Sequence, residues 1–347
     1  MVNKKRFCVT FILISLLIGL FSLFIYRYIQ YKNYNNARAE FIQTQSGKQY
    51  SIAVLAIALG RYDVFWKEFY ESGEKYFFPG QDVQYYLFTD SQDVVYKDAP
   101  NVHIIPTRSM KWPEPTLLRY DIFLSQKEEL KKYDYLYFFN MDSAFKDFVG
   151  EEILPKEDND GLVFAQHCQF YKYMESSEFP YERNPKSMAY VPYGKEGRYY
   201  VPGGLNGGTT KSFLALSEYC SKNAHKDIEN NIIPTWHDEA YTNKYILGKN
   251  PLILPLIYMR PLEPWCISTE CANKAKIELR PKIQYGGRYY LRGFSDIKST
   301  PYTRLKYKIL IHGIIFRDFL SFFFVGGIII IIFILNKFRT RISCIWS

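Results

Sequence analysis

The chain has 347 residues, of which 48% are hydrophobic, and carries a formal net charge of +9. This length fits a single α/β domain together with shorter flanking segments. The charge does not indicate nucleic-acid binding, because the basic residues that flank two terminal apolar runs account for all of it and leave the rest neutral (9 − 9 = 0). Those residues are Lys4, Lys5, Arg6, Arg27, Lys32, Arg38, Lys337, Arg339 and Arg341.

The first apolar run covers residues 7–26 and has no charged side chain. It is long enough to cross a bilayer core of about 30 Å, and the basic residues before it favour a cytosolic N-terminus. A cleaved signal peptide is the alternative, but Arg27 and Tyr28 offer no small-residue cleavage site. We therefore predict a cytosolic tail at 1–6, a retained transmembrane helix at 7–26 and a polar stem at 27–48.

Hydrophobic periodicity predicts one globular domain over residues 49–315, in which strands and helices alternate. Strands are expected at 51–59, 83–88, 102–105, 133–139 and 161–166. Helices are expected at 62–77, 116–130, 212–225 and 238–247. This order predicts an α/β fold with a mostly parallel, Rossmann-like sheet flanked by helices on both faces. No G-x-G-x-x-G or P-loop motif accompanies it, so a dinucleotide or P-loop site has no support.

The second apolar run covers residues 319–336 and is followed by three basic residues. Its eighteen residues are near the lower limit for a membrane span, so a buried C-terminal helix or strand is the alternative. The basic residues after the run obey the positive-inside rule. We therefore predict a second transmembrane helix at 319–336 and a cytosolic tail at 337–347.

Four of the six cysteines fall in the predicted domain, on the non-cytosolic side of the membrane, where disulfides can persist. Cys266 and Cys271 are close enough in sequence to close a small disulfide loop. The sequence contains no C-x-x-C pair and no His cluster that would indicate a structural zinc site.

The segment YDYLYFFNMD at 133–142 is the strongest signal for a ligand site. It reads as a buried strand that ends abruptly on Asn140 and Asp142. Ligands of open α/β sheets bind in the crevice beyond the carboxyl ends of the strands. A second acidic cluster, in WHDEAYTNKY at 236–245, opens a predicted helix. The two clusters are therefore expected to form two walls of one pocket.

With these residues in view, the chain resembles glycosyltransferase family 6, the retaining α-1,3-galactosyl- and N-acetylgalactosaminyltransferases. The resemblance covers most of residues 50–260 and rests on six blocks in chain order. These are IALGRY at 57–62, VQYYLFTD at 83–90, YDYLYFFNMDSAFKDFVGEEIL at 133–154, YERNPKSMAYVP at 181–192, GGLNGG at 203–208 and WHDEAYTNKY at 236–245. The resemblance implies a GT-A fold, a UDP-sugar donor and a galactose-containing glycan acceptor on a lipid or protein. The C-terminal apolar run is not a feature of the family.

In this resemblance, Asn140 and Asp142 stand at the family's metal-binding D-x-D motif in the donor site. Mn²⁺ in that position would use oxygen ligands and stabilise the departing diphosphate. Asp142 offers a charged oxygen, but Asn140 offers only a neutral one, and bacterial relatives with N-x-N act without metal. Dependence on Mn²⁺ is therefore left open. An Asp142 that merely caps the next helix is the structural alternative.

Glu239 aligns with the family's catalytic carboxylate, which attacks the anomeric carbon or stabilises an oxocarbenium-like transition state, and with an acceptor contact. By the same resemblance, Asp238 binds the donor sugar and Trp236 offers its face to the acceptor sugar. The alternative is that both acids only stabilise a helix N-terminus.

The resemblance also implies further contacts on both sides of the reaction. The additional donor-binding residues are Ile57, Tyr62, Arg119, Gly203 and Gly204. His167 is expected to bind the acceptor, and small residues at 203–204 leave room for a donor N-acetyl group. The basic residues expected near the diphosphate are Lys274, Lys276, Arg280 and Arg288.

These observations predict a membrane-anchored, retaining hexosyltransferase that moves Gal or GalNAc from a UDP-sugar in α-1,3 linkage. Its domain would face the Golgi lumen in a eukaryote, and the enzyme would lie in the inner membrane of a bacterium. The competing prediction is a catalytically inactive membrane protein that binds a nucleotide or glycan, because Asn140 weakens the D-x-D motif.

Overall fold

The computed structural model describes residues 2–168, 170, 175–262 and 275–293, with side chains of the first helix from residue 17 onward. The predicted second transmembrane helix, the C-terminal tail and the predicted small disulfide loop lie outside the described residues.

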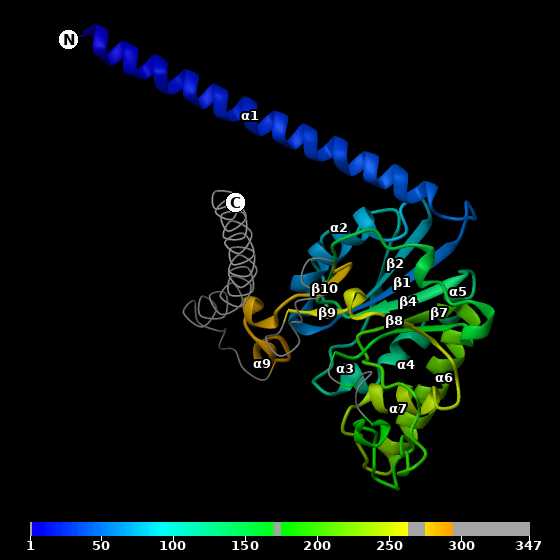
Figure 1. The fold of residues 1–347 in the computed structure, drawn as a ribbon. Helices are drawn as coiled ribbons and strands as arrows, with labels where there is room; N and C mark the ends of the chain where they lie inside the picture. Colours follow the sequence, from blue (N-terminus) through cyan, green and yellow to red (C-terminus); the bar gives the residue numbers. More distant parts are fainter. Residues whose placement is uncertain (1, 169, 171–174, 263–274, 294–347) are drawn as a thin grey trace, which may run out of the picture.

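A seven-stranded sheet in the order β3-β2-β1-β4-β7-β6-β8 forms the centre of the domain (Figure 1). β3, β2, β1 and β4 are parallel, β7 is antiparallel to both of its neighbours, and β6 and β8 are parallel. A smaller sheet has the order β5-β10-β9. The strands are β1 (Ser51–Ala58), β2 (Asp82–Thr89), β3 (Val102–Pro106), β4 (Tyr135–Phe139), β5 (Ser143–Phe145), β6 (Leu162–Ala165), β7 (Leu205–Thr209), β8 (Leu252–Leu254), β9 (Arg260–Pro261) and β10 (Ile277–Leu279).

Helices cover both faces of the large sheet, as the alternating pattern predicts (Figure 1). The α-helices are α1 (Val2–Gln43), α2 (Trp66–Tyr76), α3 (Glu114–Leu117), α4 (Arg119–Leu124), α5 (Lys127–Leu130), α6 (Thr210–Glu229), α7 (Asp238–Tyr245) and α9 (Arg288–Leu291). The 3₁₀ helices are η1 (Gly60–Phe65), η2 (Glu151–Ile153), η3 (Glu157–Asn159), η4 (Ser176–Glu178), η5 (Leu256–Tyr258) and η7 (Lys282–Tyr285).

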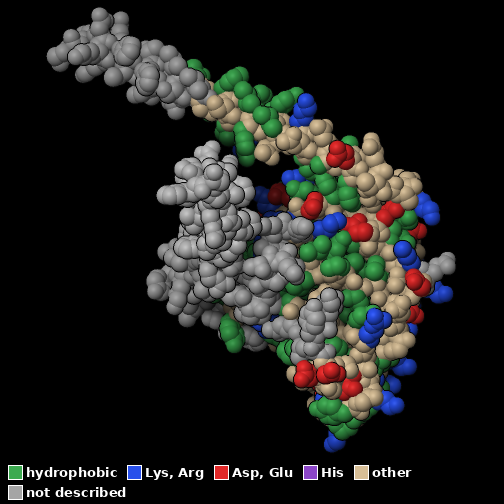
Figure 2. Space-filling model, in the orientation of Figure 1, with side chains coloured by type: hydrophobic (Ala, Val, Ile, Leu, Met, Phe, Trp, Pro, Cys, Tyr) green, Lys and Arg blue, Asp and Glu red, His purple; other side chains and the backbone are tan. Residues whose placement is uncertain are grey.

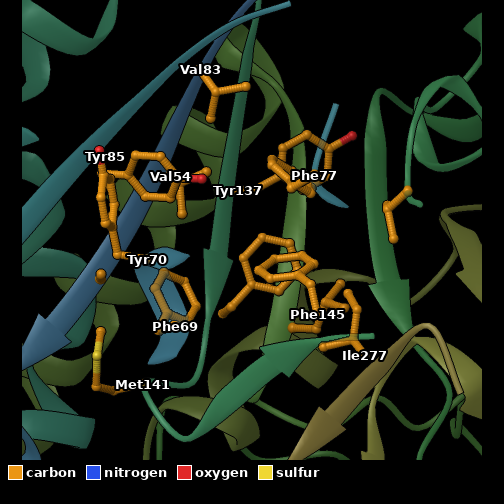
Figure 3. Close-up of a cluster of buried hydrophobic side chains, with 14 of the residues drawn as sticks. Val54, Phe69, Tyr70, Phe77, Val83, Tyr85, Tyr137, Met141, Phe145 and Ile277 are labelled. Atoms are coloured by element: carbon orange, nitrogen blue, oxygen red, sulfur yellow. The ribbon is translucent and has the colours of Figure 1, made fainter. Parts of the chain in front are cut away.

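Alternate strand residues enter two hydrophobic cores, one on each face of the sheet. On the first face, Val54 and Tyr137 pack with Phe69 of α2 (Figure 3). On the second face, Leu55 packs in a core that includes Phe123 of α4 and residues of α6 and α7. The predicted α/β class, with a mostly parallel sheet between helices, is therefore confirmed.

The central strand β7 is not predicted by the sequence pattern, because its glycines have low strand propensity. The structure shows what those glycines permit. A Cβ on Gly207 would lie 2.4 Å from Cδ1 of Tyr137, and one on Gly208 would lie 2.1 Å from the Gly161 carbonyl oxygen. Glycine therefore lets β7 fit between β4 and β6, where larger residues would clash with both neighbours.

The single helix expected at 116–130 is three short helices, α3, α4 and α5. The backbone of Leu118 has φ −102° and ψ 21°, and that of Gln126 has φ −113° and ψ 19°, so both depart from helical values. The first break directly precedes Arg119, which is buried and lines the cleft described below.

The stem expected at 27–48 is helical as far as Gln43, where α1 ends. The end of α1 packs on the domain, with the rings of Tyr34 and Phe41 stacked on Phe148 at 5.8 Å and 5.2 Å between centroids. The Tyr34 hydroxyl also donates to the Lys75 carbonyl at 2.8 Å. The end of the stem is thus part of the folded domain.

Apolar side chains of α1 are exposed between residues 17 and 31, and Figure 2 shows them along the projecting helix. These residues are Leu17, Leu20, Phe21, Leu23, Phe24, Ile25, Tyr26, Tyr28, Ile29 and Tyr31. Among the residues that the structure describes, no helix meets the length and hydropathy expected of a membrane span.

Replacing Phe41 with Ala is expected to lower the free energy of unfolding by about 1 kcal/mol, because the stacked pair with Phe148 is lost. Chemical denaturation followed by tryptophan fluorescence measures this change. Tyr31→Ala is the matched control on an exposed part of the same helix, with an expected change below about 0.5 kcal/mol. Equal effects of the two substitutions would contradict the packing of the stem on the domain.

Candidate active site

A cleft of about 780 Å³ opens at the carboxyl ends of β1 and β4, as expected for an open α/β sheet. Its walls include every residue predicted for donor binding and catalysis, whereas His167 is not among them. The predicted residues that line the cleft are Ile57, Tyr62, Arg119, Asn140, Asp142, Gly203, Gly204, Trp236, Asp238 and Glu239.

The end of β4 is joined to the loop before β7 at the floor of the cleft. The Asn140 N–H donates to the Gly204 carbonyl at 2.8 Å. A Cβ on Gly204 would lie 2.9 Å from Nδ2 of Asn140 and 2.8 Å from Sδ of Met259, so a larger residue would push the floor apart. Gly204 of the GGLNGG block is therefore required by this close approach.

Asp142 is buried beside the floor and is held by the segment that follows β10. Its carboxylate forms an ion pair with Lys282, and its backbone carbonyl accepts a hydrogen bond from the Arg280 N–H at 2.6 Å. The Arg280 side chain pairs with Glu68 of α2, which fixes this segment to the domain. The Lys282 ammonium therefore contacts the carboxylate to which the resemblance assigns a divalent cation.

These residues do not fit a resident divalent cation. Mn²⁺ takes several oxygen ligands, yet the charged oxygen donor, Asp142, already neutralises an ammonium, and Asn140 adds only a neutral amide. Across the described ranges of the chain, no group of three or more His, Cys, Asp and Glu side chains could hold a metal ion. The hydrogen-bond donor that this wall offers to the oxygens of a ligand is the Lys282 ammonium, which lines the cleft.

The opposite wall is the N-terminal end of α7, which carries Asp238 and Glu239. The Arg119 guanidinium pairs with Asp238 at 2.7 Å between Nη1 and Oδ2, and it also donates to the Gly203 carbonyl. Arg119 lies 4.2 Å above the ring centroid of Phe138, and the side chains of both ion-pair partners are almost fully buried. This pair therefore joins α4, the loop before β7 and α7 beneath the cleft.

Burial raises the pKa of both carboxyl groups on α7. The pKa of Asp238 rises to about 6 through burial, although attraction to Arg119 opposes the increase. The pKa of Glu239 rises to about 7 through burial, although the Gly203 N–H, which donates to Oε2 at 2.8 Å, opposes it. Glu239 therefore titrates near neutral pH, in the range that suits a catalytic carboxyl group.

Gly203 is the residue at which the loop meets the acids of α7. A Cβ at this position would lie 3.0 Å from Oδ2 of Asp238 and 3.2 Å from Nη1 of Arg119. A side chain at residue 203 would therefore push the ion pair apart. The close approach explains why the loop has glycine here.

Aromatic and basic side chains form the rim of the cleft. The rings of Trp112 and His237 lie 4.2 Å apart between centroids, and Arg292 lies 4.2 Å above the Trp112 ring. Tyr62 of η1 and Arg292 both line the cleft at this rim. Trp236 is 46% exposed at the cleft, so its face is available to a sugar ring.

The basic residues expected near the diphosphate are only partly brought to the cleft. Arg288 lines it. Lys276 instead pairs with Glu152 at 2.6 Å, and Arg280 supports the Asp142 wall from behind. Lys274 lies outside the described residues.

Lys282 and Arg292 line the cleft but are not predicted from the sequence. Both belong to the same basic stretch as the expected residues, so composition alone could have included them. The sequence does not show which residue of that stretch pairs with an acidic side chain from another part of the chain.

His167 is not among the residues that line the cleft. Its ring centroid is 4.6 Å from that of Phe170 and 5.9 Å from that of Tyr200, and burial lowers its pKa to about 4. The imidazole is therefore neutral at physiological pH. Its expected contact with the acceptor stays a prediction.

Comparison with known proteins shows the family of the chain. Residues 34–259 match the family model of glycosyltransferase family 6. The O-antigen biosynthesis glycosyltransferase WbnI of Escherichia coli is 33% identical over 210 residues, which are 60% of this chain and 88% of WbnI. The histo-blood group ABO system transferase 1 of Rattus norvegicus is 34% identical over 212 residues, 58% of each chain. The globoside alpha-1,3-N-acetylgalactosaminyltransferase 1 of Gallus gallus is 30% identical over 213 residues, 58% of this chain and 59% of that protein.

The relatives are glycosyltransferases, which act on a nucleotide-sugar donor and a glycan acceptor. The match covers well over half of this chain. The chain therefore belongs to glycosyltransferase family 6. The matched region spans somewhat over half of the animal relatives and most of the bacterial one.

The burial of Glu239 predicts a pH-dependent stability. The folded-state pKa of Glu239, about 7, exceeds the ordinary value of 4.5. Between these two pH values the carboxyl group is ionised in the unfolded chain but still protonated in the folded one. The free energy of unfolding of wild type therefore falls as the pH rises from 4.5 to about 7. Glu239→Gln removes this loss. We expect the variant to gain about 1–3 kcal/mol over wild type between pH 5 and pH 8. Urea denaturation measures the difference, and one that stays constant with pH would contradict the burial of an ionisable Glu239.

Lys282 lines the cleft beside Asp142, and this position predicts that its ammonium binds the nucleotide diphosphate. Lys282→Ala should weaken UDP binding by about tenfold, equally in Mn²⁺ and in EDTA, because a charge-assisted contact is lost. Isothermal titration calorimetry measures this affinity. Lys276→Ala, which removes a lysine paired with Glu152, should leave it unchanged. UDP binding that requires Mn²⁺ and is indifferent to Lys282 would contradict the prediction.

Proposed function

We propose that this family member is a retaining glycosyltransferase with a GT-A fold. It moves Gal or GalNAc from a UDP-sugar in α-1,3 linkage to a galactose-containing glycan. The observation that carries the proposal is the acidic end of α7, where Glu239 faces the cleft and titrates near neutral pH. Asp142 and its ion-pair partner Lys282 line the same cleft, and the Lys282 ammonium is the proposed contact of the donor's diphosphate.

In the proposed reaction, the bond between the anomeric carbon and UDP breaks while the ionised Glu239 carboxylate attacks that carbon or stabilises the positive charge that develops there. The acceptor hydroxyl oxygen then bonds to the anomeric carbon, and its proton passes to the departing diphosphate. Asp238, oriented by Arg119, accepts hydrogen bonds from hydroxyl groups of the donor sugar. Lys282 offsets the negative charge that accumulates on the leaving UDP. Trp236 provides an aromatic face for the acceptor sugar at the mouth of the cleft.

The resemblance favours GalNAc over Gal as the donor sugar. It associates small residues at Gly203 and Gly204, which line the cleft, with a donor N-acetyl group, although the space that Cβ atoms there would fill holds Asp238 and Met259. The Gallus gallus relative is by its name an N-acetylgalactosaminyltransferase, which agrees with this preference.

The proposal includes anchoring in a membrane with the domain on its non-cytosolic side. The exposed apolar residues of α1 and the basic residues that precede it support an anchor. Cys168 is disulfide-bonded, which suits an oxidising compartment. The compartment is the Golgi lumen in a eukaryotic host, or the outer side of the inner membrane in a bacterial host.

A second function is favoured by one specific observation. Asn140 is neutral and Asp142 is already paired with Lys282, so the site has lost the charge of a D-x-D motif. A protein that binds a nucleotide or glycan without turnover would tolerate this loss. The preserved pairing of Arg119 with Asp238, beside Glu239, favours catalysis instead.

The test is UDP release by the full chain in detergent, with UDP-Gal or UDP-GalNAc and with lactose or N-acetyllactosamine as acceptor. Acceptor-stimulated release should fall at least about a hundredfold in Glu239→Gln, because the charge at the reacting carbon is lost. Glu229→Gln, at an exposed residue that ends α6, is the matched control and should behave as wild type. UDP binding without release from either donor would favour the non-catalytic function.

A further inference from the structure

Glu68 of α2 holds the segment that carries Lys282, and it does so at two residues. The first is Arg280, whose Nε donates to Oε2 of Glu68 at 2.9 Å while its Nη2 pairs with Oε1. A two-point contact between a guanidinium and a carboxylate fixes orientation as well as distance. Glu278 also contacts Arg280, at 3.4 Å, but it lies two residues earlier in the same segment and does not join that segment to α2.

The second residue that Glu68 holds is Tyr285, at the end of η7. The Tyr285 hydroxyl donates to Oε2 of Glu68 at 3.5 Å, which makes this the weaker of the two contacts. The Tyr285 ring also lies 4.4 Å from that of Phe65 between centroids, so the residue packs on η1 as well. Glu68 therefore contacts residues on both sides of Lys282 in the sequence.

The backbone next to Lys282 is held on the cleft side too. The Arg280 N–H donates to the Asp142 carbonyl at 2.6 Å, and the Lys282 ammonium pairs with the Asp142 carboxylate. A lysine side chain is long and loses rotamer freedom when its ammonium binds a ligand. A backbone that is already fixed reduces the ordering that binding still requires. The grip of Glu68 on Arg280 therefore acts on how readily the Lys282 ammonium reaches a ligand in the cleft.

We propose that Glu68 is a positioning residue for Lys282, and that its pairing with Arg280 holds the Lys282 ammonium where the diphosphate of the donor binds. The role deepens the proposed transferase function and rests on it. Residue 68 lies outside the six sequence blocks that carry the family resemblance, which assign it no part.

The sign of the Glu68 charge makes this role testable. Glu68 is described in the structure and is not among the residues that line the cleft, so it acts on a bound ligand through other residues or through its charge. Its carboxylate repels a diphosphate, so by charge alone its removal would strengthen the binding of UDP. A positioning role predicts the opposite, because the segment that carries Lys282 is then held less firmly.

The first experiment measures UDP affinity of the full chain in detergent by isothermal titration calorimetry, in EDTA. Glu68→Gln keeps the shape of the side chain and removes its charge, and it should weaken UDP binding by about fivefold. An unchanged or tighter affinity in Glu68→Gln, with weaker binding in Lys282→Ala, would overturn the positioning role and leave the proposed function in place.

Glu71→Gln is the matched control, because it removes the same charge from the same helix. Glu71 is paired with Lys67 at 3.9 Å and accepts the Tyr96 hydroxyl, away from the segment that carries Lys282. UDP affinity in this variant should stay within about twofold of wild type. A fivefold loss in Glu71→Gln as well would show a general effect of α2 and overturn the proposal.

The second experiment combines Glu68→Gln with Lys282→Ala. Two residues that act through one contact are not additive, so Glu68→Gln should change UDP affinity by less than about twofold once Lys282 is absent. A fivefold loss that persists in the Lys282→Ala background would indicate a merely structural Glu68 and overturn the proposal.

The same variants separate this role from the proposed function. The expected affinities in a protein that releases no UDP from either donor in the presence of acceptor would support the role of Glu68 in diphosphate binding and contradict the proposed transfer. A wild type that does not bind UDP would contradict both.

Discussion

The buried ion pair of Arg119 and Asp238 is the interaction on which the rest of the cleft depends. Arg119 is 5% exposed and Asp238 is 4% exposed, and together they join α4, the loop before β7 and the start of α7. A buried charge without its partner is strongly destabilising, so neither side chain can change alone. The pair also explains Gly203, because the guanidinium donates to the carbonyl of that residue and leaves no room for a Cβ.

The two sides of the cleft differ in charge in a way that suits transfer of a sugar from a diphosphate. The α7 side presents acids whose pKa values are raised by burial, and the Asp142 side presents an ammonium. The developing positive charge of the sugar and the negative charge of the leaving group would therefore each meet the opposite sign. Lys282 lies in a segment that the ion pair between Arg280 and Glu68 fixes to the domain.

The sequence predicted five strands of the large sheet, its edge and most of the cleft, because these follow from local patterns. Buried strands end at Asn140, and an acidic pair opens α7, so both clusters could be placed at the same edge. The strand β7 could not be predicted, because its glycines are explained by contacts with Tyr137 and Gly161. Lys282 could not be assigned for the same physical reason, since its role depends on Asp142, a partner that is distant in sequence.

The central claim is that Glu239 acts on the anomeric carbon of an α-linked UDP-sugar with retention of configuration. Proton NMR of the product, formed by wild type from UDP-GalNAc or UDP-Gal and lactose, tests it most directly through the coupling constant of the new anomeric proton. The account predicts the small coupling of an α linkage, attached at O3 of the acceptor galactose. The large coupling of a β linkage would show inversion and contradict the role assigned to Glu239.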